Sequence, residues 1–114
     1  MKKLTIGSTE YIRDWSYAGE VANAMHLICN KGSTTDYIIG SGKGTSIKSI
    51  LNIIFSHFKL HWEDHVLIDK NLLRKGDPLQ IISNPNKIKK DTGWSTTIEI
   101  EDILEKCIKS RLKI

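Results

Sequence analysis

No stretch of this 114-residue chain is apolar over the roughly 20 residues that a membrane-spanning helix needs. The N-terminal segment MKKLTIGSTEY carries two lysines but no apolar run after them, so we expect no secretory signal peptide. There is no low-complexity run either, and 39% hydrophobic with 26% charged residues is typical of a globular protein. One folded domain spanning residues 1–114 is therefore predicted.

Cysteine is scarce, because the chain holds only Cys29 and Cys107. Both lie in apolar patterns with helical spacing, which predicts two small core residues rather than a disulfide or a nucleophile pair. Unpaired core thiols are typical of a reducing compartment, so we expect a cytoplasmic protein.

Several nucleotide-binding and catalytic motifs are absent. The segment GSGKGTS, residues 40–46, lies between a predicted strand and a predicted helix, where a phosphate-binding loop would stand. It is not a Walker A loop, because Lys43 is followed by glycine, and its evenly spaced glycines do not fit the GxGxxG pattern. The chain also lacks a GxSxG elbow and the Tyr-x-x-x-Lys pair of short-chain dehydrogenases. We interpret residues 40–46 as a flexible turn and predict no catalytic residue in this chain.

Three histidines, His57, His61 and His65, recur every four residues. They would share one helical face, but the apolar stripe of that helix ends at Phe58, and HWEDH lacks the HExxH order of zinc proteases. No metal site is predicted.

Short apolar runs bounded by glycine or polar residues predict strands at 4–6, 37–39 and 66–68. Apolar residues at helical spacing predict helices at about 16–29, 46–58 and 100–112, and a short one beginning near Asn84. Short strands alternating with helices indicate a small α/β unit. Three such strands make a thin sheet, so we expect the unit to need a partner surface.

Helix-start signals sharpen these boundaries. Serine and asparagine are good N-cap residues, and proline suits the first helical position. The predicted N-caps are Ser16, Ser46 and Asn84, with Pro85 opening the short helix.

Two arginines are candidates for binding an anion. Arg13 stands between a predicted strand and a predicted helix, and Arg74 lies in the loop after the third predicted strand. Arginine grips diphosphates bidentately, and two that converge from separate loops can clamp one. Taken alone, they are two loop arginines, and a surface ion pair is the simpler interpretation of each.

Several segments together resemble the extended short-chain dehydrogenases/reductases (the NAD-dependent epimerase/dehydratase family), and within them the GDP-mannose 4,6-dehydratases. They follow the family's order over nearly the whole chain: TIGSTEYIRDWSYAGEVANAM, DYIIGSGKGTSIKSI, WEDHVLID, LLRKGDP and SNPNKIKKDTGW. The resemblance implies the C-terminal, nucleotide-sugar-binding lobe of such an enzyme, with few short strands, three to four helices and no complete Rossmann domain.

The resemblance also assigns roles to residues. Arg13 corresponds to the arginine of Arg-Asp-Trp that contacts the nucleotide diphosphate, and Arg74 to a second phosphate-binding arginine. Asp77 stands where the family's Arg-Pro-x-Glu motif has a ribose-binding glutamate, and Lys75 replaces the proline. Ser8 occupies the place of an asparagine in the family's Gly-Asn-Leu stretch. Four further matching positions are expected to be structural: Asn84, Lys87, Gly93 and Trp94.

The family's dinucleotide-binding loop and its Tyr-x-x-x-Lys lie upstream of the matched stretch. The resemblance therefore implies NADP for the intact enzyme but no cofactor bound by this chain alone, and no catalysis without the missing half. GDP-mannose or a related nucleotide sugar is the implied ligand, and polysaccharide precursor supply the implied pathway.

Two alternatives come from other classes of protein. A formal charge of +4 is compatible with a nucleic-acid-binding module, but Trp15, Trp62 and Trp94 are too far apart to interleave with a basic stripe. We expect neither a nucleic acid nor a membrane as partner. The other alternative is an interaction or oligomerisation domain, since the family packs this lobe against the cofactor domain; it predicts an uncovered apolar face and self-association.

Overall fold

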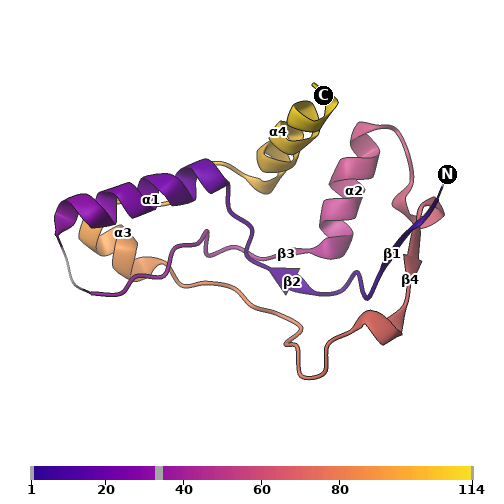
Figure 1. Ribbon diagram of the computed structural model, residues 1–114, viewed down its shortest axis with the longest axis horizontal. Coiled ribbons are helices and arrows are strands. Elements are labelled where there is room, and N and C mark those ends of the chain that lie inside the picture. The colour runs from indigo at the N-terminus through magenta and orange to yellow at the C-terminus, as the bar shows by residue number, and fades with distance from the viewer. Residues whose placement is uncertain (1, 33–34, 114) are drawn as a thin grey trace.

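The computed structural model describes residues 2–32 and 35–113, and its elements are short strands interspersed with helices (Figure 1). The strands are β1 (Leu4–Ile6), β2 (Ile12–Arg13), β3 (Thr45–Ser46) and β4 (Val66–Ile68). The helices are α1 (Ala18–Lys31), α2 (Ile47–His57), α3 (Asn86–Thr92) and α4 (Ile100–Leu112), with 3-10 turns η1 (Trp62–Asp64) and η2 (Lys70–Leu72). The predicted small α/β unit with few short strands and three to four helices is confirmed.

The strands form two small sheets rather than one. β1 pairs with β4 in parallel, with Leu4 opposite Val66 and Ile6 opposite Ile68. β2 pairs with β3 in antiparallel orientation, with Arg13 opposite Thr45. The β2–β3 pair was not predicted, because two-residue strands leave no periodicity in the sequence.

Two separate clusters of buried side chains form the core. Ala24, Ile88 and Trp94 join α1 to α3 and to the segment after it. At the other end of the molecule, Leu51 of α2 packs with Trp62 and Val66. The β2–β3 pair lies between these two ends (Figure 1). The burial of Trp94 confirms its predicted role as a packing anchor.

The segment 37–39 is not a strand, and that prediction is wrong. Among the described residues no strand pairs with this segment, and it contributes to the fold through side-chain packing rather than backbone pairing. Tyr37 and Ile39 lie against the Ala24–Ile88–Trp94 cluster, while Ile38 is exposed. The Tyr37 hydroxyl donates a hydrogen bond of 2.9 Å to Asp91 of α3. An apolar run of three residues was thus a packing signal and not a backbone-pairing signal.

Helix α1 begins two residues later than predicted, and Ser16 is not its N-cap. Tyr17 occupies that position and makes no side-chain capping bond. The helix also runs on to Lys31 and ends at Gly32, which has φ 66° and can adopt this left-handed conformation freely. The turn residues Asn30, Lys31, Gly32 and Ser33 were expected to close this helix, and of these Ser33 lies outside the described residues.

Helix α2 confirms its prediction most closely. Ser46 is its N-cap, and the side-chain oxygen accepts a hydrogen bond of 3.1 Å from the Ser49 amide. Helix α3 begins one residue later than predicted, with Pro85 at the N-cap. Asn84 nevertheless accepts a hydrogen bond of 3.1 Å from the Asn86 amide, so it still satisfies an N-terminal donor.

Cys29 and Cys107 are exposed free cysteines, so their prediction as core residues is wrong. Helix α1 turns Ala24, not Cys29, to the cluster, and no described residue of α4 is fully buried. The apolar residues of α1 and α4 form stripes wider than the surface that neighbouring segments cover, so residues at the edges of these stripes are exposed to solvent.

The molecule is thin and incompletely covered. Its radius of gyration is 16.9 Å, against about 13 Å for a compact chain of this length. Its extents of 51 × 38 × 20 Å leave many large apolar side chains exposed, among them Leu4, Leu67 and Ile68 of the β1–β4 pair. None of the described helices combines the length and the apolar character needed to cross a bilayer.

Candidate functional site

Arg13 is positioned by backbone pairing on both sides of β2. On one side lies β3, and on the other the Ile12 amide donates to the Leu79 carbonyl at 2.9 Å. The Ile81 amide donates back to the Ile12 carbonyl at 3.1 Å. The loop that follows Arg74 is thereby held beside Arg13, although the two residues are far apart in sequence.

The Arg13 guanidinium contacts this loop directly. Its Nη2 lies 2.8 Å from Asp77 Oδ1 in an ion pair and donates to the Pro78 carbonyl at 3.0 Å. Its Nη1 donates to the carbonyls of Ile12 at 2.8 Å and of Leu79 at 3.3 Å. The guanidinium carbon lies 5.2 Å from the centroid of the Tyr11 ring, a cation–π contact. The side chain is therefore held in one orientation.

A tight turn brings Arg74 to the same place. The Asp77 amide donates to the Arg74 carbonyl at 3.3 Å, closing a β-turn over Lys75 and Gly76. Gly76 has φ 78°, a left-handed conformation that favours glycine. This turn places Asp77 beside Arg13 and leaves the Arg74 side chain exposed.

All three residues predicted to bind substrate line one open cavity of about 270 Å³. The end of β1 contributes Gly7 and Ser8 to the same cavity. The Ser8 hydroxyl accepts a hydrogen bond of 3.0 Å from the Glu10 amide, so it shapes the loop after β1. The remaining lining residues are mainly apolar: Ile6, Tyr11, Trp15, Ile47, Leu72 and Leu73. The cavity thus combines two cations, one carboxylate and an apolar wall.

Asp14 is a residue whose importance the motif analysis missed. Its Oδ1 accepts hydrogen bonds from the amide (3.0 Å) and the hydroxyl of Ser41, and its Oδ2 accepts from the Gly42 amide at 2.9 Å. The amide (3.2 Å) and the hydroxyl of Ser83 also donate to Oδ2. Burial raises the pKa of Asp14, but these hydrogen bonds outweigh burial and hold the pKa below its usual value. One carboxylate thus ties three distant segments together beside Arg13.

The glycine-rich segment predicted to be a turn is held by this carboxylate. A Cβ at Gly40 would overlap the Ser83 hydroxyl and lie 2.7 Å from Ser83 Cβ, so glycine is required by close approach. Lys43 points away to Glu99, with which it forms an ion pair of 2.8 Å. The side chain that a phosphate-binding loop would use is therefore already paired.

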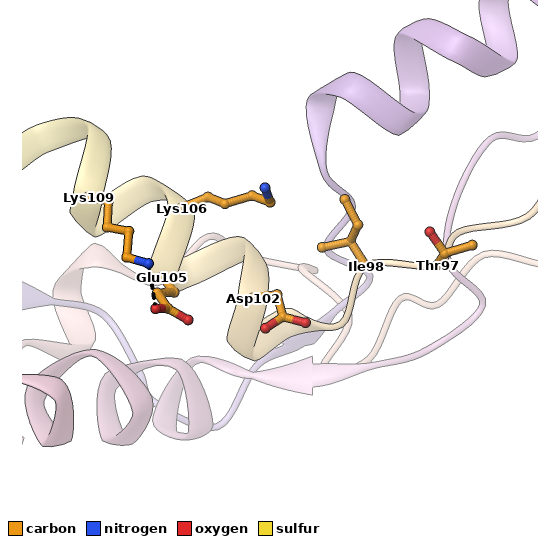
Figure 2. Close-up of a pocket in the computed structure, with 6 residues that line it drawn as sticks. All are labelled: Thr97, Ile98, Asp102, Glu105, Lys106 and Lys109. Atoms are coloured by element: carbon orange, nitrogen blue, oxygen red, sulfur yellow. Dashed lines mark ion pairs between the residues drawn. The ribbon is translucent and has the colours of Figure 1, made fainter.

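A second cavity, of about 380 Å³, lies on the surface of α4 and the segment before it (Figure 2). Glu105 and Lys109 form an ion pair of 2.9 Å along the helix. This contact lowers the pKa of Glu105 and raises that of Lys109. Lys106 extends from the helix toward Tyr17, with its amine 5.5 Å from the ring centroid. The negative charges of Asp102 and Glu105 in this cavity equal the positive charges of its two lysines, so the cavity does not favour a diphosphate.

No group of three or more His, Cys, Asp or Glu side chains in residues 2–32 and 35–113 could hold a metal ion. His57 ends α2, whereas His61 and His65 flank η1, so the three do not share one helical face. The His65 ring stacks on Phe55 with centroids 5.4 Å apart.

The positions expected to be structural make structural contacts. Lys87 donates to the Thr35 hydroxyl and to the Asp36 carbonyl, the latter at 2.7 Å. Gly93 ends α3 in a left-handed conformation with φ 79°. The indole nitrogen of Trp94 donates to the Glu20 carbonyl of α1 at 3.0 Å.

Comparison with known proteins agrees with this architecture. The family model described as GDP-mannose 4,6 dehydratase matches residues 1–107. GDP-mannose 4,6 dehydratase 1 of Arabidopsis thaliana is 28% identical over 112 residues, covering 98% of this chain and 31% of the relative.

Two solved structures share the fold. The dTDP-glucose 4,6-dehydratase of Bacillus anthracis in complex with NAD superposes with a TM-score of 0.84 at 19% identity, over 98% of this chain and 35% of that one. The UDP-glucose 4-epimerase of Thermotoga maritima with UDP-glucose superposes with a TM-score of 0.77 at 27% identity, over 97% of this chain and 35% of that one. The chain spans about a third of the length of these relatives. On the strength of a family match over nearly its whole length, the chain belongs to the GDP-mannose 4,6 dehydratase family.

Proposed function

We propose that this chain is the nucleotide-sugar-binding lobe of a sugar-nucleotide 4,6-dehydratase or epimerase, with a GDP-mannose-like ligand. The observation that carries the proposal is the convergence of Arg13 and Arg74, from separate segments, on one cavity. Arginine binds phosphate oxygens through paired N–H donors, so two guanidinium groups suit a diphosphate. Asp77 is the third residue of the proposed ligand site.

The apolar wall of the cavity supports a ligand with more than phosphate. Tyr11 and Trp15 offer ring surfaces, and Ile47 and Leu72 offer aliphatic ones. Sites for small ligands are usually apolar with a few polar groups that set orientation. A nucleoside diphosphate, with a flat base and a doubly charged linker, has this combination of surfaces.

We propose that this chain does not catalyse the family reaction alone. It has no Tyr-x-x-x-Lys pair and no GxGxxG loop, and it spans about a third of relatives whose structures are described with NAD. NADP is the cofactor proposed for the intact enzyme type, held by the part of the relatives that this chain does not span.

Titration calorimetry with GDP and GDP-mannose tests the proposal. The wild-type chain should bind both, and an Arg13→Ala/Arg74→Ala variant should bind at least about tenfold more weakly, because charge-assisted hydrogen bonds to the diphosphate are lost. Arg74→Ala alone should also weaken binding. It is the cleaner variant, since no hydrogen bond or ion pair of the Arg74 side chain exists among the described residues.

A matched control removes two positive charges elsewhere. Lys90 and Arg111 are exposed and do not line the cavity, so Lys90→Ala/Arg111→Ala should bind as the wild type does. If both double variants weakened ligand binding equally, the loss would be explained by net charge alone. No binding at millimolar GDP would refute the proposed function.

A second function, assembly with another copy of this chain, is favoured by the shape. The accessible surface is 8351 Å², against about 6,300 Å² for a compact monomer of this mass. The excess of about 2,000 Å² is larger than the roughly 800 Å² that each partner buries in a standard interface. A lobe that leaves so much surface uncovered has enough for self-association, alone or together with ligand binding.

A further inference from the structure

The guanidinium of Arg13 is already occupied in the ligand-free chain. An arginine has five N–H donors, and four hydrogen bonds from Arg13 go to acceptors within the protein. Three of these acceptors belong to the consecutive residues Asp77, Pro78 and Leu79. The group best suited to bind a phosphate thus faces an internal carboxylate.

Arg74 provides the contrast within the same cavity. No ion pair or hydrogen bond involves its guanidinium in the part of the chain that the structure describes, and its side chain is exposed. The two arginines are therefore unequal: Arg74 is ready for an anion, and Arg13 has to exchange partners first.

The Arg13–Asp77 pair is suited to such an exchange. The side chains keep 25% and 33% of their exposure, so water reaches the contact at 2.8 Å. Partly exposed ion pairs contribute little to folding because solvent screens them. A diphosphate carries more charge than one carboxylate and can meet the same donors.

We propose that Asp77 is an internal competitor: its carboxylate occupies Arg13 in the empty site and is displaced when a diphosphate binds. The inference rests on the proposed function and adds to it a residue that sets affinity. Asp77 is then a positioning residue that acts on the ligand through Arg13, and not a contact to the ribose.

The two roles of Asp77 predict opposite results. Asp77→Asn removes the charge but keeps an oxygen that can accept from Arg13, and Asp77→Ala removes the acceptor as well. If Asp77 competes for Arg13, both variants should bind GDP and inorganic pyrophosphate about two- to fivefold more tightly, the range expected for loss of an exposed ion pair. If Asp77 binds the ribose, both should bind GDP more weakly and pyrophosphate unchanged.

Calorimetry with GDP and with pyrophosphate separates these outcomes. Asp64→Asn is the matched control, because it removes the same charge from an exposed residue that does not line the cavity. Tighter binding of both probes by the Asp77 variants but not by Asp64→Asn supports the inference. Unchanged or weaker pyrophosphate binding overturns it while the proposed function stands, whereas a wild-type chain that binds neither probe overturns both.

Discussion

At the scale of single residues, Asp14 ties together the segments that lie next to Arg13. Its carboxylate accepts hydrogen bonds from the amides of Ser41, Gly42 and Ser83 and from the hydroxyls of Ser41 and Ser83. Burial raises the pKa of Asp14, but these donors lower it below its usual value. Asp14 is adjacent to Arg13 in sequence, so weakening its hydrogen bonds would also affect the position of the arginine. The contribution of Asp14 to folding depends on its negative charge and on both carboxylate oxygens accepting hydrogen bonds.

Asp14→Asn should therefore destabilise the fold by about 1–3 kcal/mol, because the new amide group would face the N–H donors of Gly42 and Ser83. Urea unfolding at pH 7 measures the effect. The matched control is Asp64→Asn, which changes an exposed carboxylate and should leave the midpoint within error.

The same residue predicts a pH dependence. A carboxylate whose pKa is lower in the folded chain than its unfolded value of about 3.9 stabilises the fold above that value. That stability is lost as the pH falls through the lowered folded pKa. The difference in stability between wild type and Asp14→Asn should therefore shrink below about pH 4. A difference in stability between the two proteins that stays constant down to about pH 2.5 would contradict this account.

At the scale of elements, Glu20 connects the first turn of α1 to the segment that leads into α4. Its carboxylate accepts from the Thr97 amide at 2.7 Å, the Thr97 hydroxyl at 3.0 Å and the Ile98 amide at 3.1 Å. Helix α4 has no fully buried residue among those described, so this connection matters for where the helix lies.

Glu20→Ala should raise hydrogen exchange at the Thr97 and Ile98 amides by about tenfold or more, since one charge-assisted hydrogen bond lost from each corresponds to that factor. Mass spectrometry of peptides covering residues 95–104 measures it. Glu101→Ala, an exposed acid in the first turn of α4, is the control and should leave those amides unchanged. Faster exchange in both variants would point to general fraying of α4 instead.

At the scale of the whole molecule, the β1–β4 pair is the surface most in need of cover. Parallel strands occur almost only with both faces buried, because their crossovers place helices there. Here Ile6 and Val66 pack on α2 residues, but Leu4 and Ile68 of the same face are about half exposed, and Leu67 of the other face is 50% exposed. Side chains alternate between faces along a strand, so Leu67 marks the uncovered side.

Sedimentation velocity should therefore give an average mass above 12.9 kDa that rises with concentration. Leu67→Lys should shift the chain toward monomer, since a charge on this face opposes burial. Thr5 faces the same side, and Thr5→Ser serves as a conservative control. A monomer at several hundred micromolar would rule out self-association through this face.

Sequence reasoning named the residues of the proposed site but not the contacts between them. Arg13, Arg74 and Asp77 were predicted through a family resemblance, and the structure brings all three to one cavity. The ion pair between Arg13 and Asp77 was not predictable, because it depends on the pairing of β2 with residues 79–81, across more than 60 positions. The role of Asp14 was missed for the same reason, since its partners come from two other loops.

Among the helices and strands too, features set by local sequence were predictable and features set by distant contacts were not. Helix α2, with its apolar stripe and the Ser46 N-cap, follows from local spacing and capping, which the sequence alone contains. The start of α1, the exposure of Cys29 and the unpaired segment 37–39 depend on which surfaces other segments cover. The sequence by itself determined the small α/β composition and the N-cap of helix α2, because these rest on short-range chemistry, whereas the cationic residues of the proposed site came from the family resemblance. Only the tertiary structure decided that Arg13 faces an internal carboxylate and that one face of the β1–β4 pair is left open, because both depend on contacts between residues distant along the chain.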